Sequence, residues 1–116
     1  MDQYHVWCNL KPKTSDVAFC DDVRRYLSAL RDDGRIRGFR VTRRKLGLGP
    51  SELPEFHIAI DVEDLAQLER AFQSVSARED PIEELHARVN QVACDVRFAL
   101  YRDFPDPQRR RGGERF

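Results

Sequence analysis

The chain has 116 residues, which suits one domain that buries a core without disulfides or metal ions to hold it together. Hydrophobic residues make up 41% of it and charged residues 34%, a composition typical of soluble globular proteins. Twenty basic and twenty acidic side chains cancel, so no net field attracts nucleic acid or a membrane surface. Because the sequence shows neither a membrane-spanning apolar run nor a signal peptide, we expect a cytoplasmic protein.

The first strand is predicted over residues 4–10, because side chains alternate there between two faces. Its apolar side consists of Tyr4, Val6, Cys8 and Leu10, and its other side of His5, Trp7 and Asn9. A helix follows over about 15–33, with Thr14, Ser15 or Asp16 as its cap, apolar residues at helical spacing, and Gly34 at its end.

Two further strands are predicted over 36–46 and 56–62, separated by a loop over 47–55 that contains two glycines and two prolines. In the first of them, the apolar side consists of Phe39 and Val41, and the other side of Arg40, Thr42 and Arg44. In the second, the apolar side consists of Phe56, Ile58, Ile60 and Val62, and the other side of His57, Ala59 and Asp61.

The second half of the chain predicts two helices and a last strand. Asp64 caps a helix that ends near Ala77, with Gln67 in capping-box position and a buried stripe of Leu65, Leu68, Ala71, Phe72 and Val75. Pro81 opens a short helix whose buried side is Ile82, Leu85 and Val89. A strand over 92–101 then turns Cys94, Val96, Phe98 and Leu100 inward and Asp95, Arg97, Ala99 and Tyr101 outward. One continuous helix over 82–101 is the alternative.

This order of elements is the split βαβ plan of a ferredoxin-like α+β fold, βαββαβ with an extra short helix before the last strand. Right-handed crossovers place the helices on one face of an antiparallel four-stranded sheet with strand order 4-1-3-2. We expect a single domain over 1–104. Prolines, glycines and arginines over 105–116 predict an extended or disordered C-terminal tail.

We call the face of the sheet without helices the open face. Its predicted members are His5, Trp7, Asn9, Arg40, Thr42, Arg44, His57, Ala59, Asp61, Asp95, Arg97 and Ala99. A tryptophan in the middle of a face otherwise left to water suggests that something covers it. A second copy of the chain is the commonest cover, so we expect a homodimer through this face.

Five segments carry a resemblance to a known group of proteins: YHVWCNLKP, FCDDVRRYL, RVTRRKLGLGP, EFHIAIDV and FALYRDFPDP. Together they resemble a small, uncharacterised bacterial family labelled a domain of unknown function, and more broadly the dimeric α/β-barrel group of ferredoxin-like proteins. The resemblance covers nearly the whole chain. It implies two facing sheets, but no activity and no catalytic residues, because that group includes monooxygenases, isomerases, dehalogenating enzymes and plain ligand binders.

His5 and His57 are the first candidates for a site, because they lie on neighbouring central strands and point to the same side of the predicted sheet. Imidazole exchanges protons near neutral pH and binds metal ions. The pair could handle protons in an enzyme, oriented by Asp61. It could also hold a metal together with Asp61, or only form hydrogen bonds inside a dimer interface.

The neighbouring side chains could position a ligand. Trp7 could stack on a planar aromatic molecule or pack against the dimer partner, with Asn9 beside it. The arginines of this face could bind an anion or pair with its two carboxylates; these residues are Arg40, Arg44 and Arg97, and Asp61 and Asp95. We therefore expect a pocket for a small aromatic or anionic molecule on the open face. The alternative is a non-catalytic dimerisation or regulatory module.

Other features predict structure rather than chemistry. Cys8, Cys20 and Cys94 match no disulfide or zinc spacing and are expected as buried, reduced thiols, with no metal or other cofactor; a redox or metal role is the alternative. The glycine-rich segment 43–50 lacks the pattern of a nucleotide-binding loop and is expected to be a lid or a dimer arm. His86 is expected on the surface, and the three arginines at 109–111 are too few to indicate nucleic-acid binding.

Overall fold

The computed structural model describes residues 1–105, so the predicted tail lies, from residue 106 on, outside the described residues. The elements in chain order are β1 (Asp2–Leu10), α1 (Asp16–Asp32), β2 (Gly38–Arg43), β3 (Phe56–Val62), α2 (Leu65–Ser76), α3 (Ile82–Val92) and β4 (Ala93–Arg102). In the described part of the chain, no helix is long and apolar enough to cross a membrane.

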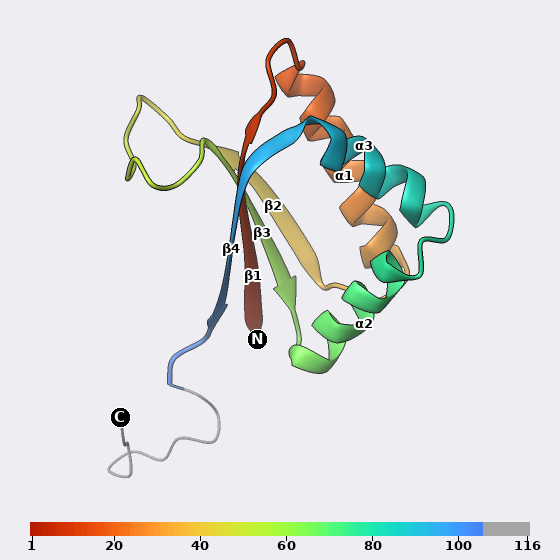
Figure 1. The fold of residues 1–116 in the computed structure, drawn as a ribbon. Helices are drawn as coiled ribbons and strands as arrows, with labels where there is room; N and C mark the ends of the chain where they lie inside the picture. The colour runs from red at the N-terminus through yellow and green to blue at the C-terminus, as the bar shows by residue number, and fades with distance from the viewer. Residues whose placement is uncertain (106–116) are drawn as a thin grey trace.

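The four strands form one antiparallel sheet in the order β2-β3-β1-β4. This is the predicted order 4-1-3-2 counted from the other edge, and the ferredoxin-like α+β prediction is confirmed. All three helices lie on one side of the sheet, and the other side carries none (Figure 1). β1 and β3 are the central strands, so His5 and His57 lie on neighbouring central strands.

Some element boundaries differ from the prediction. β1 begins at Asp2, two residues before the predicted strand, and β2 spans Gly38–Arg43 only, within the predicted 36–46. The alternative of a continuous helix over 82–101 is wrong, because α3 ends at Val92 and β4 begins at the next residue.

Local hydrogen bonds explain where the two long helices begin. Ser15 caps α1, since its hydroxyl accepts a hydrogen bond from the backbone N–H of Ala18. Asp64 caps α2 in the same way, by accepting from the backbone N–H of Gln67 at 2.8 Å. The buried amide of Gln67 also donates to the carbonyl of Gly34 at 3.0 Å, which ties the start of α2 to the end of α1.

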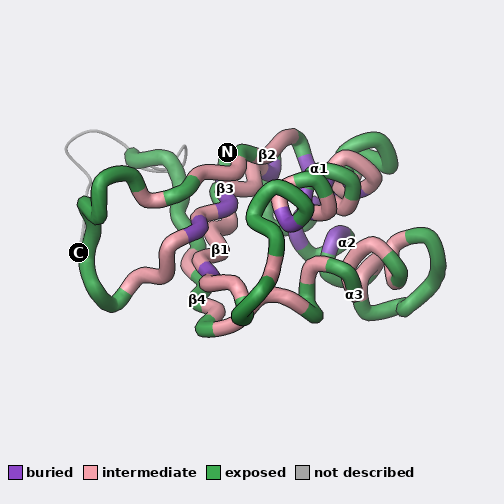
Figure 2. Tube along the Cα trace, turned by 90° about the horizontal axis from the view of Figure 1, so that it is seen from above, coloured by how far each residue is buried: buried purple, intermediate pink, exposed green. Residues whose placement is uncertain are grey.

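The core lies between the sheet and α1 (Figure 2), where the buried residues gather. It consists of Cys8, Phe19, Val23, Leu27, Leu30, Ile36, Phe56, Ile58, Val62, Leu68 and Ala71. Within it Phe19 meets Phe56 edge to face, with ring centroids 5.3 Å apart. The predicted apolar stripe of α1 and the apolar side of β3 supply most of these residues.

Several residues that were predicted to be buried are exposed. Leu65 and Phe72 of α2, and Phe98 and Leu100 of β4, each have about half of their surface in water, at 47%, 45%, 62% and 51%. For Phe98 and Leu100 the physical reason is that β4 packs mainly against β1 and has little helix cover of its own. Likewise Leu85 is only partly buried, while Ile82, Val89 and Val92 of α3 pack against the core.

A β-bulge in β4 changes which face of the sheet Cys94 lies on, relative to the prediction. Trp7 lies opposite Arg97, but Asn9 lies opposite Cys94, so the register slips by one residue between them. Asp95, within the slip, has a positive φ of 54°. Because opposed residues share a face, Cys94 lies on the open face with Asn9 and not in the core, where it was expected. Ala93 packs against the core in its place.

Candidate functional site

Four aromatic rings gather on the open face, and we call them the histidine–tryptophan cluster: His5, Trp7, His57 and Tyr101. The rings of Trp7 and His57 stack with centroids 4.8 Å apart and planes 12° apart, and His5 stacks on both. The ring of Tyr101 meets His5 edge-on at 5.0 Å. The predicted neighbours His5, Trp7 and His57 are thus brought into contact, and Tyr101 joins them from β4.

A hydrogen bond of 2.8 Å joins His5 Nδ1 to His57 Nε2. The tautomers decide which ring donates, but one of the two nitrogens must carry a proton and the other must not. Both side chains are partly buried. Burial, and then the charge on His5, hold the pKa of His57 below its usual value of 6.5.

The polar residues of the open face form separate contacts at its two ends. Asp61 accepts a hydrogen bond from the amide of Gln3 at 2.9 Å, so it does not orient a histidine as predicted. At the other end, Asn9 donates to Asp95 at 3.1 Å and accepts from the backbone N–H of Glu55. The carboxylates of Asp61 and Asp95 therefore have amide partners.

The three predicted arginines are not brought together. Arg44 lies outside β2 and donates to the carbonyls of Pro50 and Leu53, so it braces the loop that precedes β3. This loop projects from the sheet on the side away from the helices (Figure 1). Arg40 lies opposite Ala59, and Arg97 lies opposite Trp7, both exposed at the flanks of the cluster.

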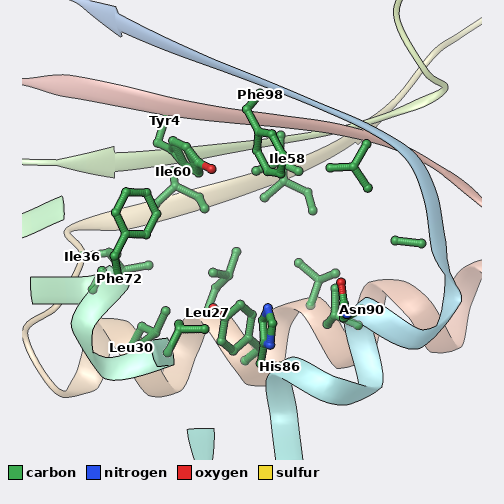
Figure 3. A pocket seen from close by; sticks show the side chains of 18 of the residues that line it. Tyr4, Leu27, Leu30, Ile36, Ile58, Ile60, Phe72, His86, Asn90 and Phe98 are labelled. Atoms are coloured by element: carbon green, nitrogen blue, oxygen red, sulfur yellow. The ribbon is translucent and has the colours of Figure 1, made fainter. Parts of the chain in front are cut away.

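A pocket of about 340 Å³ lies on the opposite face of the sheet, between the strands and the helices. Side chains of the sheet, among them Tyr4, Ile58, Ile60 and Phe98, face Leu27, Leu30, His86 and Asn90 of the helices across it (Figure 3). Most of the lining is aliphatic or aromatic. Phe72 and Phe98 both pack on the ring of Tyr4, with centroids 5.4 and 5.9 Å away.

The polar groups of this pocket were not predicted as site residues. His86 was expected on the surface, but it is partly buried, and its ring lies 5.4 Å from that of Tyr26. Burial raises the pKa of Tyr26 to about 12, which keeps its hydroxyl protonated. The only sequence signal was helical spacing: Val89 and Ile82 were predicted to face inward, and His86 lies between them at positions i+4 and i−3.

The cysteines and acidic residues offer no metal centre. Among residues 1–105, no three His, Cys, Asp or Glu side chains come close enough to hold a metal ion. Cys8 is buried in the pocket wall, and burial raises the pKa of its thiol to about 11.

Comparison with solved structures shows the same fold in proteins of low sequence identity. A protein of Arabidopsis thaliana has a TM-score of 0.69 at 10% identity, covering 91% of this chain and 98% of its own. SnoaB, a cofactor-independent oxygenase from Streptomyces nogalater, has a TM-score of 0.65 at 8% identity, covering 93% and 97%. A dimeric ferredoxin-like protein of unknown function from Jannaschia sp. has a TM-score of 0.64 at 12% identity, covering 89% and 100%.

Sequence comparison gives a family but no activity. No curated protein matches the chain. One family model matches residues 1–116, the full length of the sequence. The chain therefore belongs to DUF6614, a family of unknown function.

Proposed function

We propose that this chain is a homodimeric small-molecule-binding protein. A second copy covers the open face, and the pocket between sheet and helices takes a small, largely apolar molecule. The observation that carries this proposal is the pocket itself, because its volume of about 340 Å³ and its apolar wall with a few polar groups are typical of ligand sites.

The lining favours an aromatic ligand over an anionic one. Tyr4, Tyr26, Phe72 and Phe98 present rings to the pocket, and aromatic rings attract one another when offset or edge to face. Its described lining includes no lysine or arginine, so a full negative charge would find only His86 as a counter-charge. His86 and Asn90 can instead orient a hydroxyl or carbonyl group of the ligand.

The open face supports the dimer. A tryptophan and two histidines stack in its middle, a tyrosine meets one of the histidines edge-on, and Ala59 and Ala99 lie beside them. Large aromatic residues are enriched in protein interfaces. Two of the leucines on the projecting loop, Leu46 and Leu48, are exposed on the same side of the sheet. A role of this loop as a dimer arm stays a prediction.

The ligand site is tested with the neutral aromatic probe N-phenylnaphthylamine, whose fluorescence rises in apolar surroundings. We expect wild-type protein to bind the probe and Val89→Trp to lose at least about tenfold in affinity, because the indole fills the pocket. Val17→Trp, on the exposed side of α1, is the matched control and should bind as wild type does. Equal binding by both variants, each folded by circular dichroism, would place the probe elsewhere.

The dimer is tested by sedimentation equilibrium at pH 7.5 in the micromolar range. We expect a dimer for wild type and a folded monomer for Ala59→Arg, because a guanidinium at the centre of the open face cannot be buried without a partner. Ala66→Arg, on the exposed side of α2, is the control and should remain dimeric. A wild-type monomer, or a dimeric Ala59→Arg variant, would overturn the open-face dimer.

A second candidate places the ligand on the open face, with His5 and His57 moving protons and Trp7, Arg40 and Arg97 positioning the substrate. The 2.8 Å hydrogen bond between the two imidazoles favours it, since a proton on this pair is shared. A structure of natively purified protein distinguishes the candidates. Ligand density between two copies beside His5 would support the catalytic version, and density beside His86 would support the helix-side pocket.

A further inference from the structure

The bond between His5 and His57 exists in only some protonation states. It persists when both rings are neutral, and also when one ring is protonated, because an imidazolium can donate to a neutral imidazole. When both rings are protonated, two N–H donors meet at 2.8 Å and the bond is lost. The hydrogen bond therefore forms unless both rings are protonated.

No carboxylate stabilises a doubly charged pair within the described contacts. Beside the rings lie Trp7, Tyr101, Ala59 and Ala99, none of which is a carboxylate. The remaining charged and polar groups of this face come from all four strands: Gln3 and Asn9 on β1, Arg40 and Thr42 on β2, Asp61 on β3, and Cys94, Asp95 and Arg97 on β4. The two carboxylates are held by amides at the ends of the face, and the nearer flanks carry arginines.

We propose that the homodimer dissociates on mild acidification, because both imidazoles of the His5–His57 pair then become protonated inside the interface. This inference rests on the proposed open-face dimer. Two-fold symmetry places two such pairs in one interface, so full protonation buries up to four positive charges among aromatic rings and beside arginines. Separation of the two copies returns these charges to water.

The direction of the effect follows from proton linkage. A histidine whose pKa lies below its free value favours the state that keeps it neutral, and here that state is the dimer. The dimer is therefore at full strength at pH 6.5 and above, and it weakens as the pH falls through the pKa of His57 in the single chain, which lies below 6.5. The pKa of His57 is already lowered in the single chain, by burial and by His5, and a covering partner removes more water from the pair.

Sedimentation equilibrium of the wild-type chain between pH 7.5 and 5.0 tests the inference. We expect the dimer dissociation constant to rise by about tenfold or more over this range, the effect of one pKa unit at a single group. In His57→Gln the amide can still accept or donate but does not titrate, so its dimer should lose most of this dependence. The third histidine is the matched control, and His86→Gln should keep the wild-type dependence.

The emission of Trp7, the single tryptophan, gives a second readout on the same samples. Protonation of the stacked His57 should change it in wild type and His86→Gln, whether or not the chain is dimeric, and His57→Gln should show a smaller change, because only the more distant ring of His5 still stacks on Trp7. A wild-type dimer whose dissociation constant is the same at pH 5.0 and 7.5, or an equal rise in His57→Gln, would overturn the switch alone. A monomer at pH 7.5 would overturn the dimer and the switch with it.

Discussion

The two faces of the sheet differ in what completes them. On the helix side, α1 buries the apolar residues of β1 and β3, and the gap left beneath α2, α3 and β4 is a pocket within one chain. On the open face, the rings of the histidine–tryptophan cluster are stacked and hydrogen-bonded but only partly buried. One face thus carries the core and an apolar pocket, and the other carries the surface on which we propose that a second copy docks. Because side chains alternate along a strand, neighbouring residues of one strand lie on these two different faces.

The largest expected effect comes from placing the same charge on either face. Ile58 is 5% exposed on the helix side, and its neighbour Ala59 is on the open face. Ile58→Arg should leave the chain unfolded at 25 °C, with no cooperative thermal transition. The reason is that burying an unpaired guanidinium costs more than the few kcal/mol that hold a small domain together. Ala59→Arg should keep a cooperative thermal transition, with a midpoint lowered only by the loss of the dimer. Circular dichroism melts check both, and a folded Ile58→Arg variant would contradict the assignment of the faces.

A smaller effect on stability is expected where the first residue of β1 meets the last residue of β4. Asp2 is buried, and Arg102 donates to both of its carboxylate oxygens, at 2.7 and 3.3 Å. Asp2→Asn should lower the free energy of unfolding by about 1–2 kcal/mol, because a charge-assisted pair is lost while Arg102 is still partly in water.

The pH dependence of this loss checks its cause. Hydrogen bonding to Arg102 holds the pKa of Asp2 below its usual 3.8, so the contribution is complete above that pH and is lost as the pH falls through the lowered pKa. The difference between wild type and Asp2→Asn in urea denaturation should therefore shrink as the pH falls below 3.8. A constant difference down to pH 2 would mean that the charge of Asp2 is not responsible.

The smallest expected effect is a difference in labelling rate between two cysteines on opposite faces of the sheet. Cys8 lines the helix-side wall with a pKa of about 11, so only about one thiol in a thousand is ionised at pH 8. Cys94 lies on the open face and is partly exposed in the single chain, so the two thiols are compared in the Ala59→Arg variant, which is expected to be a monomer. Iodoacetamide should modify Cys94 well before Cys8, as peptide mass spectrometry can measure. In urea the two should react at similar rates, and faster labelling of Cys8 in the native state would contradict its burial.

Much of the fold could be predicted from local patterns. Period-two alternation in residues 4–10 and 56–62, with helical spacing between and after them, was sufficient for the strand order. Asp64 marked the start of one helix, and Ser15 was one of three candidate caps for the other, because the hydrogen bonds that cap a helix are local. The bulge at Asp95 could not be predicted in this way, because an added residue is visible only against the partner strand β1.

The candidate site was predicted for one face only. Alternation brought together His5, Trp7 and His57, since residues on neighbouring strands meet when their faces agree. It did not reveal the pocket beside His86, because a pocket is the space that helices fail to fill, and this depends on how α2 and α3 pack over β4. The exposure of Phe72 and Phe98 could not be predicted for the same reason. Their spacing predicts burial, but the described helices do not cover their rings.

The position of β1 in the sheet has a consequence for how the chain folds as it is synthesised. β1 emerges before the other strands, but its neighbours β3 and β4 lie more than 45 residues later, and Asp2 pairs with Arg102, 100 residues along the chain. Such pairings close long loops and are slow to form. During synthesis β1 therefore stays unpaired until β3 and β4 have emerged from the ribosome. The sheet can be completed only when almost all of the described chain has been released.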